Sequence, residues 1–553
     1  MLTLSIKTVS SLEKCFWDDD LASIPEKKEF VMLKNERLSF QVVYRAQDDS
    51  RNISRATPIS LSGELAPYTT VRLVGNVLNM YPTYNVPFEG ELIRTDPGAY
   101  PDLLRPLTYP NAISLPNGQT LSLFVDIELP EDFPAGEYPF ALTVTKKGEV
   151  LGEATATVRV IDALLPPQTL IHTEWFYTDC IANYYHTKAF SEAHWRAIES
   201  YMRTAVKNGI NMILTPVFTP ELDTRVGGER LTTQLVDIEL LEDHSYRFTF
   251  DKLHRFIDLA LSSGVRYFEI PHFFTQWGAK ATPKIVVKVK GRKRKYFGWH
   301  TDALSEEYRR FLAAFIPALV GEFKKRGLDH NCYYHVSDEP GHTMLSHYAA
   351  CKERIAPYLE GYPIIDAMSN LDFYKEGVLE KPVPNTRSAM TFIEAGVKDL
   401  WVYYCGGGNA GVSDRSLSMP LARTRILGVQ LYLYRIAGFL HWGYNFYNTW
   451  LSYGELDPYA SPEGGYFNPA GDCFLVYPGT DGKAWESLRL NALREAMDDI
   501  RALTLYEERF GREATERLIL EGTDGRLDFT HYPTDPAYLI TLREKIAAAL
   551  SDS

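Results

Sequence analysis

The feature that most constrains the fold of this chain is an alternation of short apolar segments with amphipathic helical segments after Pro167. Such an alternation is typical of parallel βαβ units, in which each helix crosses back to begin the next strand. Eight strand candidates over roughly 280 residues match the length and rhythm of a (β/α)8 barrel. They begin near Leu170, Asn211, Tyr267, Cys332, Pro363, Thr386, Leu400 and Gly438. We therefore predict a TIM-like barrel over residues 168–480, with a poorly defined sixth strand and helix over 382–396.

Helical candidates lie between most of these segments, at 191–207, 251–262, 305–326, 343–359 and 419–437. An open, doubly wound sheet is the alternative fold for this pattern. That fold commonly carries a Gly-rich phosphate loop, and Gly406-Gly-Gly408 is not followed by the Lys-Ser/Thr pair of such a loop. The barrel is therefore the preferred prediction.

The regions on either side of the barrel have different patterns. Residues 1–165 contain several short segments rich in β-branched residues and separated by turn residues, which predicts an antiparallel β-sandwich. Leu165-Pro166-Pro167 reads as the linker that ends it. Residues 481–553 show apolar positions at helical spacing, and we expect these helices to pack on the barrel. The whole chain is thus predicted to be a multidomain β plus α/β protein.

The charge of the chain narrows its possible partners. A net charge of −13 argues against nucleic acid, because phosphate binding requires a basic surface. One basic run, 288–295, reads as a hairpin with Lys290-Gly291-Arg292 at its turn. Aromatic residues make up 13% of the chain, and sugar-binding clefts use aromatic faces, although large cores also absorb aromatic side chains.

Cysteine usage and the amino terminus bear on the compartment. The six cysteines show no C-x-x-C spacing, so they indicate neither a zinc site nor a disulfide framework. The first residues read as a strand and not as a signal peptide. No apolar run approaches the roughly 20 residues that a transmembrane helix needs. We expect a cytoplasmic protein without a membrane partner.

Two adjacent carboxylates end the fourth strand candidate, in the segment Tyr333-Tyr-His-Val-Ser-Asp-Glu-Pro-Gly341. A barrel enzyme presents its catalytic groups at such strand ends. Pro340 is expected to push Glu339 away from helical dihedral angles and toward an extended conformation. Asp338 and Glu339 could bind a metal, act as glycosidase acids, or serve only as an ion pair or helix cap. The other strand ends show no cluster of acids and imidazoles, so we predict no metal and no other cofactor.

The adjacency of the two acids restricts which glycosidase chemistry is possible. Direct retaining enzymes hold two carboxyls about 5 Å apart on opposite sides of the sugar, and inverting enzymes separate them further. Chain neighbours have Cα atoms about 3.8 Å apart and belong to one corner of a site. Asp338 and Glu339 suit hydrolysis of a 2-acetamido sugar, in which the substrate's own carbonyl oxygen is the nucleophile. Glu339 would then be the acid and base, and Asp338 would orient the acetamido N–H and stabilise the oxazolinium charge.

Several motifs of the chain resemble glycoside hydrolase family 123. They are His335-Val-Ser-Asp-Glu-Pro-Gly, Gly438-Phe-Leu-His-Trp-Gly-Tyr-Asn, Val476-Tyr-Pro-Gly-Thr-Asp-Gly and the segment 488–499. The resemblance covers most of the chain, and the Asp-Glu pair is its most specific part. It implies an exo-acting β-N-acetylgalactosaminidase with Asp338 and Glu339 as the catalytic pair. The preference for N-acetylgalactosamine over N-acetylglucosamine comes from this resemblance alone.

Residues at other strand ends are candidates for sugar contacts. Glu174 and Trp175 follow the first strand, and Glu174 is the main rival for an acid role, although a supporting hydrogen bond is the preferred interpretation. His272 follows the third strand and is either a core residue or a ligand to a sugar hydroxyl. Asn370 follows the fifth strand and is a further candidate for a sugar contact.

The last two strands supply the remaining candidates. Tyr403 or Tyr404 should direct its hydroxyl at the acetamido carbonyl oxygen, and strand alternation allows only one of them to point inward. Trp442 is expected to stack under the sugar ring, and Asn445 lies beside it in sequence. Two other functions stay open: a glycosidase for sugars without an acetamido group that uses another carboxylate such as Glu174, and a non-catalytic carbohydrate-binding barrel. The sequence leaves the oligomeric state open.

Overall fold

The computed structural model describes residues 2–49, 53–84, 92–406 and 411–551, which form two compact units. The first unit comprises Met1–Gln168, Gly408–Leu433 and Trp485–Ser553, and the second comprises Thr169–Gly407 and Tyr434–Ala484. This division differs from three consecutive domains, because two later segments of the chain return to the first unit. Among the described residues, no helix combines the length and apolar character needed to cross a membrane.

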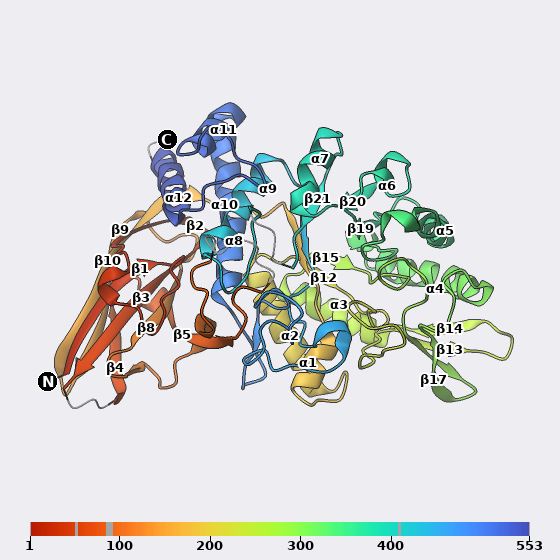
Figure 1. Ribbon diagram of the computed structural model, residues 1–553, viewed down its shortest axis with the longest axis horizontal. Helices are drawn as coiled ribbons and strands as arrows, with labels where there is room; N and C mark the ends of the chain where they lie inside the picture. Colours follow the sequence, from red (N-terminus) through yellow and green to blue (C-terminus); the bar gives the residue numbers. More distant parts are fainter. Residues whose placement is uncertain (1, 50–52, 85–91, 407–410, 552–553) are drawn as a thin grey trace. The chain divides into compact units, whose positions relative to one another are not determined.

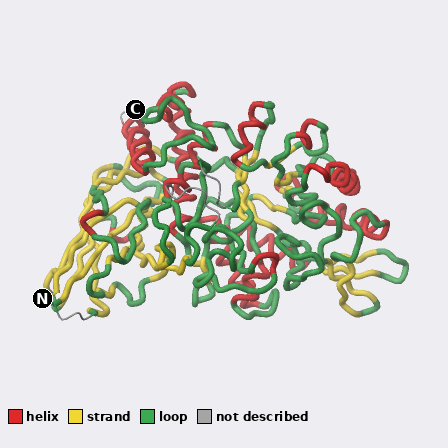
Figure 2. The backbone as a smooth tube through the Cα atoms, in the orientation of Figure 1, coloured by secondary structure: helices red, strands yellow, loops and turns green. Residues whose placement is uncertain are grey.

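The first unit contains two five-stranded sheets (Figure 1, red to orange; Figure 2, yellow). One sheet has the order β1 (Leu2–Ser10), β3 (Arg37–Asp48), β8 (Thr120–Glu128), β5 (Thr69–Asn79), β6 (Gly98–Pro106). The other has the order β2 (Glu29–Lys34), β10 (Glu149–Leu164), β9 (Gly136–Lys146), β4 (Ser54–Ser62), β7 (Ala112–Leu115). All neighbouring strands are antiparallel except β10 and β2.

The two sheets share one hydrophobic core because alternate side chains along each strand are apolar and point to the same face. Phe40 of β3 and Phe140 of β9 meet edge to face, with ring centroids 5.0 Å apart. The N-terminal antiparallel β region that the sequence predicts is confirmed.

The first unit also contains the C-terminal helices, whereas the sequence predicts that they pack on the barrel. These are α10 (Leu488–Phe510), α11 (Arg512–Leu520) and α12 (Pro536–Ser551), joined by α8 (Leu421–Arg425) and α9 (Leu427–Leu433). Helix α10 packs on α8, α9 and β6, whereas α12 packs on β10 and β2. An ion pair links α10 to the β region: the fully buried guanidinium of Arg489 in α10 lies 2.9 Å from the carboxylate of Asp102 in β6.

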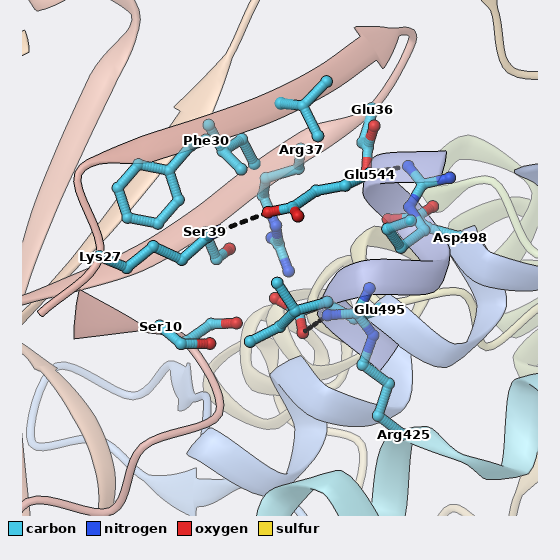
Figure 3. Close-up of a pocket in the computed structure, with 15 residues that line it drawn as sticks. Ser10, Lys27, Phe30, Glu36, Arg37, Ser39, Arg425, Glu495, Asp498 and Glu544 are labelled. Carbon is cyan, nitrogen blue, oxygen red and sulfur yellow. Dashed lines mark hydrogen bonds and ion pairs between the residues drawn. The ribbon is translucent and has the colours of Figure 1, made fainter. Parts of the chain in front are cut away.

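Charged side chains also form ion pairs around a small cavity of about 70 Å³ in the first unit (Figure 3). Lys27 pairs with Glu544 at 2.6 Å and Arg425 pairs with Glu495 at 2.9 Å. The cavity is therefore lined by groups that already neutralise one another, and we interpret it as part of the packing between α12, α10 and the strands.

Eight parallel strands organise the second unit. They are β11 (Ile171–Glu174), β12 (Met212–Leu214), β15 (Tyr267–Glu269), β18 (Cys332–Tyr333), β19 (Ile365–Ala367), β20 (Lys381–Val383), β21 (Trp401–Tyr403) and β22 (Gly438–His441). Six of them form one sheet in the order β18-β15-β12-β11-β22-β21, and β19 pairs with β20. Single parallel bridges join Tyr334 to Ile364 and Asn385 to Tyr403.

Seven of the eight strand candidates coincide with these strands, and the sixth was wrong. The segment beginning at Thr386 is helical, with a 3-10 turn at Thr386–Ser388 followed by α7 (Ala389–Glu394). Asn385 starts this turn by accepting a hydrogen bond from the backbone N–H of Arg387 at 3.1 Å. The sixth strand is β20, which contains a proline and is only three residues long, so it carries a weak strand signal.

Further helices surround these strands in the second unit. They are α1 (Thr178–Tyr184), α2 (Glu192–Lys207), α3 (Asp251–Ser263), α4 (Glu306–Lys325), α5 (Leu345–Ile355) and α6 (Asp372–Lys375). The basic run forms the predicted hairpin of β16 (Ile285–Val289) and β17 (Arg292–Phe297), and Lys290 and Gly291 at its turn have φ values of 47° and 79°. The hairpin extends a small sheet with β13 (Asp237–Leu240) and β14 (Tyr246–Thr249), which the sequence did not predict.

Candidate active site

A cavity of about 220 Å³ opens where the parallel strands of the second unit end. Its lining residues follow or close β11, β12, β15, β18, β19, β21 and β22, so the carboxyl ends of the parallel strands supply the site, as the strand ends of a parallel barrel commonly do. The described lining residues are Trp175, Tyr177, Leu222, Asp223, Gln276, Trp277, Asp338, Glu339, Ala367, Tyr403, Cys405, Gly406, Leu440, Trp442, Phe467 and Asn468. Apolar and aromatic walls with a few polar groups are typical of pockets for small organic ligands.

Asp338 and Glu339 lie on a strained corner of this cavity. Glu339 has a φ of 40°, in the left-handed region, so the extended conformation expected from Pro340 was wrong. The corner is held by the backbone N–H of Trp277, which donates to the carbonyl oxygen of Asp338 at 2.8 Å. A tertiary contact has therefore overridden the local preference of the residue before a proline.

Three residues that line the cavity share this left-handed conformation: Asp223, Trp277 and Glu339 have φ values of 45°, 55° and 40°. Each such residue costs about 1–3 kcal/mol unless its surroundings compensate, and such strain gathers at functional sites. Three strained residues around one cavity are consistent with a functional site there.

The two carboxylates have different surroundings. Glu339 is exposed and accepts a hydrogen bond from the hydroxyl of Tyr403. Asp338 is half-buried, and burial together with the nearby charges of Glu339 and Asp366 raises its pKa well above the ordinary range. Burial and the charge of Glu339 likewise raise the pKa of the Tyr403 hydroxyl, which keeps its proton for donation. Burial and the neighbouring acids therefore favour the protonated form of Asp338.

A buried histidine clamped between two carboxylates lies behind the acidic corner. His335 Nε2 is 2.7 Å from Glu269 Oε1, and His335 Nδ1 is 3.0 Å from Asp366 Oδ1. Burial alone would lower the pKa of His335, but the hydrogen bonds and charges of the two carboxylates raise it to about 9. The ring is thus an imidazolium at neutral pH, and its positive charge partly opposes the repulsion that Asp338 feels from the other acids.

Asp366 also fixes the backbone that leads to the corner with Asp338 and Glu339. Its Oδ2 accepts from the backbone N–H of Val336 at 3.0 Å and from the hydroxyl of Tyr348 at 2.5 Å. Glu269 links His335 to the cavity wall, because the Oε1 that faces His335 also accepts from Trp175 Nε1 at 2.8 Å. The sequence prediction missed both acids; the available signal was a charged residue inside each of two apolar strands.

His272, His335 and Asp366 lie close enough together to be considered as metal ligands. A metal requires a neutral imidazole with a free lone pair, whereas both nitrogens of His335 already face carboxylates and carry protons. His272 stacks on His335 with ring centroids 4.3 Å apart, and burial and His335 lower its pKa well below the ordinary value. The cluster fits a hydrogen-bonded imidazolium and does not fit a metal centre.

Three of the predicted sugar-contact residues line the cavity. They are Trp175, Tyr403 and Trp442. The indole N–H of Trp442 donates to Asp472 at 3.0 Å, which fixes the ring plane at the cavity wall. Tyr404 does not line the cavity among the described residues; its ring packs against Phe439 and His441. Strand alternation therefore left two choices, and the structure selects Tyr403.

The structure places the other candidates away from the cavity. Glu174 is buried beside His172, with Nε2 and Oε1 3.3 Å apart. His272 belongs to the stacked pair described above. Asn370 accepts from the backbone N–H of Asp372 at 3.0 Å, as at the start of a helix. Asn445 exchanges hydrogen bonds of 2.9 and 3.0 Å with the backbone of Tyr177, so it positions a residue that lines the cavity.

The sequence prediction also missed several residues that line the cavity, namely Tyr177, Asp223, Gln276, Phe467 and Asn468. They lie in irregular loops after β11, β12, β15 and β22. No periodicity or motif singles them out, since loop residues approach a site only through the fold.

Comparisons with solved structures support the fold. The chain is similar to a family 123 glycoside hydrolase from Clostridium perfringens, described for glycolipid glycan hydrolysis, with a TM-score of 0.73, 13% identity, and coverage of 100% of this chain and 98% of that chain. A xyloglucanase from Bacteroides ovatus matches at a TM-score of 0.33 and 9% identity, covering 85% of this chain and 98% of that chain, which is too distant to inform the fold. A search of curated proteins found no match.

The family comparison covers nearly all of the second unit and, from the first unit, residues 408–433 and 485–506. The description "Glycoside hydrolase 123, catalytic domain" matches residues 175–506, which is more than half of the chain and includes the Asp338-Glu339 pair. The resemblance predicted from the motifs is confirmed. The chain belongs to glycoside hydrolase family 123 and is a glycosidase with a carbohydrate substrate.

Proposed function

We propose that the chain is an exo-acting β-N-acetylgalactosaminidase that retains configuration through an oxazolinium intermediate. The observation that carries this proposal is the placement of Asp338 and Glu339 on one corner of one cavity, with Tyr403 donating to Glu339. Two carboxylates from one corner are poorly placed to flank the anomeric carbon as acid and nucleophile. A nucleophile supplied by the substrate removes this difficulty.

In the first proposed step, the acetamido carbonyl oxygen attacks C1 as the glycosidic C1–O bond breaks, and the leaving oxygen takes the proton of Glu339. The substrate then carries a five-membered oxazolinium ring. In the second step, Glu339 takes a proton from water, the water oxygen attacks C1, and the ring opens to restore the acetamido group. Holding the nucleophile within the substrate supplies the rate advantage of an intramolecular reaction.

The electrostatics of the pair suit this division of roles. An acetamido N–H that donates to Asp338 would favour its ionised form. Glu339 would carry the proton that the leaving oxygen takes. The ionised Asp338 would stabilise the oxazolinium charge. Tyr403 would shift its hydroxyl from Glu339 to the acetamido carbonyl oxygen and orient it for attack. Trp175 and Trp442 provide aromatic walls for the sugar ring.

We also propose that the eight parallel strands form a closed (β/α)8 barrel. The two single bridges, Tyr334–Ile364 and Asn385–Tyr403, support this because they connect β19 and β20 to the ends of the six-stranded sheet. Closure would bring all eight strand ends around the cavity.

A panel of three aryl glycosides tests the proposed function: the β-N-acetylgalactosaminide, the β-N-acetylglucosaminide and the β-galactoside. We expect turnover of the first, weaker turnover of its C4 epimer, and none of the sugar without the acetamido group. A thiazoline mimic of the oxazolinium ring should inhibit competitively. Equal cleavage of the plain galactoside would contradict a nucleophile supplied by the substrate.

A further inference from the structure

A third acid, Asp223, lines the same cavity as Asp338 and Glu339. It belongs to the long loop after β12, far from both acids in sequence. The residue is only 8% exposed, and within the described residues neither of its carboxylate oxygens makes a hydrogen bond of normal geometry, although the backbone N–H of Leu451 acts on the carboxylate. Buried polar groups in native proteins are nearly always paired, so such a carboxylate requires an explanation.

The backbone around Asp223 is held from two sides. Its N–H donates to the side chain of Gln276, and its carbonyl oxygen accepts from the hydroxyl of Ser452 at 2.8 Å. Gln276 also donates to the carbonyl oxygen of Thr224 at 3.1 Å, so one side chain clamps two consecutive residues. The neighbouring loops therefore maintain the left-handed φ of 45° at Asp223, and the side chain is presented to the cavity at an energetic cost.

The electrostatic setting shows that the structure does not stabilise the charge of this carboxylate. Burial raises the pKa of Asp223 to about 7, although the Arg230 guanidinium and the backbone N–H of Leu451 act in the opposite direction. Arg230 is engaged elsewhere, with hydrogen bonds of 2.7 and 2.8 Å to Asp179. A ligand that donates hydrogen bonds to Asp223 would replace the hydrogen bonds to water that the carboxylate loses on burial.

The chemistry of such a ligand follows from the cavity. A carboxylate has two oxygens and can accept from two neighbouring hydroxyl groups, as a sugar ring offers. In the proposed mechanism, Asp338 and Glu339 attend the acetamido group at C2 and the glycosidic oxygen at C1. The remaining donors of the terminal sugar are the hydroxyls at C3, C4 and C6. We propose that Asp223 binds one or two of these hydroxyls and so contributes to the recognition of the terminal sugar, an inference that rests on the proposed function.

A matched control residue lies two positions away in the same loop. Glu221 is 7% exposed, and burial raises its pKa to about 7 as well. It does not line the cavity among the described residues, and its Oε1 accepts from the backbone N–H of Lys284 at 2.6 Å. Glu221→Gln keeps that acceptor, so it changes a buried loop acid without changing the sugar site.

The experiment measures kcat/KM for the wild-type enzyme, Asp223→Ala, Asp223→Asn and Glu221→Gln. The substrates are the aryl β-N-acetylgalactosaminide and its 3-deoxy, 4-deoxy and 6-deoxy analogues. For the wild type, we expect a loss of roughly 10- to 150-fold when the contacted hydroxyl is removed, the range of a hydrogen bond to a charged group. For Asp223→Ala, kcat/KM on the intact substrate should fall by a similar factor. Removal of the contacted hydroxyl from the substrate should then lower kcat/KM of this variant little further. Glu221→Gln should follow the wild type throughout.

Two outcomes would overturn the proposal. One is wild-type activity of Asp223→Ala on the intact sugar. The other is a loss of kcat/KM in Asp223→Ala, relative to the wild type, that is equal for the intact substrate and for every deoxy analogue. If azide restored the activity of Asp223→Ala, Asp223 would be a nucleophile, which would contradict the proposed mechanism as well. Circular dichroism and thermal unfolding check the fold, and the near-isosteric Asp223→Asn provides the comparison if the alanine variant does not fold.

A wrong substrate assignment can be distinguished from a wrong role for Asp223. If the wild-type enzyme cleaves another glycoside in preference, the deoxy series is made on that sugar, because hydroxyl binding by Asp223 does not depend on the acetamido group. If no aryl glycoside is cleaved, calorimetric titration of the wild type and Asp223→Ala with N-acetylgalactosamine and its deoxy analogues tests the same contact. Equal affinities of the two proteins for all these sugars would then reject it.

Discussion

Asp338 and Glu339 are neighbours in the chain, yet their surroundings differ in a way that suits the two roles proposed for them. Glu339 is exposed and is reached by the hydroxyl of Tyr403, whereas Asp338 is half-buried among other acids. A proton donor must exchange protons with water during each cycle, which suits the exposed member of the pair. The half-buried member suits electrostatic stabilisation, because charges interact more strongly where water is excluded.

Replacing Glu339 should separate substrates by their leaving groups. Glu339→Gln cannot protonate the leaving oxygen, so kcat for aglycones of high pKa should fall about 10²- to 10⁴-fold. Dinitrophenyl glycosides need little protonation and should lose much less. A plot of log kcat/KM against leaving-group pKa measures the difference. Asp338→Asn serves as the comparison and should slow both kinds of substrate, and a flat plot for Glu339→Gln would remove Glu339 from the acid role.

Asp223 should reduce the stability of the folded chain in a manner that depends on pH. Its pKa is about 7 in the folded chain and near 4 when unfolded, so the folded state retains the proton more strongly. The free energy of unfolding should therefore fall as pH rises from about 4 to about 7, by up to about 4 kcal/mol. The facing charges are those of Arg230, which weakens the effect, and Asp338.

Urea unfolding at pH 4 and pH 8 checks this expectation. Asp223→Asn should be more stable than the wild type at pH 8 and equal to it at pH 4. Glu221→Gln should show the same gain, because burial raises the pKa of Glu221 similarly, but it should retain full activity. If both variants gain stability but only Asp223→Asn loses activity, Asp223 is a binding residue that lowers the stability of the folded chain. A loss of stability in Asp223→Asn at pH 8 would contradict it.

At the scale of elements, one close helix contact depends on a glycine. A Cβ at Gly428 in α9 would lie 2.2 Å from the carbonyl oxygen of Ala496 in α10, so a larger residue must push the helices apart. Gly428→Ala should lower the free energy of unfolding by about 1–3 kcal/mol, as overpacking does. Gly321 in α4 is the control, since a Cβ there would meet nothing within 4 Å.

Gly321→Ala should therefore stabilise by about 0.5–1 kcal/mol, the difference in helix propensity between the two residues. Chemical unfolding of both variants and the wild type measures the effects. Equal changes in the two variants would show that propensity, and not the approach of α9 to α10, controls position 428.

At the scale of the whole molecule, the chain does not divide into consecutive domains. Segments 408–433 and 485–553 belong to the same compact unit as residues 1–168. In a chain shortened to 169–553, α12 would lose β10 and β2, and Arg489 would lose its partner Asp102. A buried charge without its partner costs about 3–5 kcal/mol. We expect the shortened chain to aggregate or to unfold without a cooperative transition.

Expression of 169–553 beside the full chain, followed by size-exclusion chromatography and thermal unfolding, tests this expectation. A soluble, cooperatively folded and active fragment would contradict it. That result would favour the consecutive domains predicted from the sequence, in which the C-terminal helices rest on the barrel.

Much of the local structure could be predicted because it depends on residues close together in the chain. Seven of the eight parallel strands, the hairpin at Lys290 and the acidic corner all carry local signals. Alternating or continuous apolar residues indicate a buried strand, and a glycine between two strands indicates a turn that needs a left-handed conformation. Acids directly after an apolar strand indicate that the chain leaves the core there. The sixth strand failed because three residues with a proline carry too little pattern.

The sequence by itself determined the family and seven of the eight parallel strands, and it singled out Asp338 and Glu339 as candidates, because each of these depends on residues close together in the chain. Only the tertiary structure decided that Tyr403 and not Tyr404 faces the cavity, that Glu269 and Asp366 clamp His335, and that Asp223 joins the acids. The physical reason is distance along the chain. These contacts join loops and strands far apart in sequence, and no local preference encodes which strand ends will meet around one cavity.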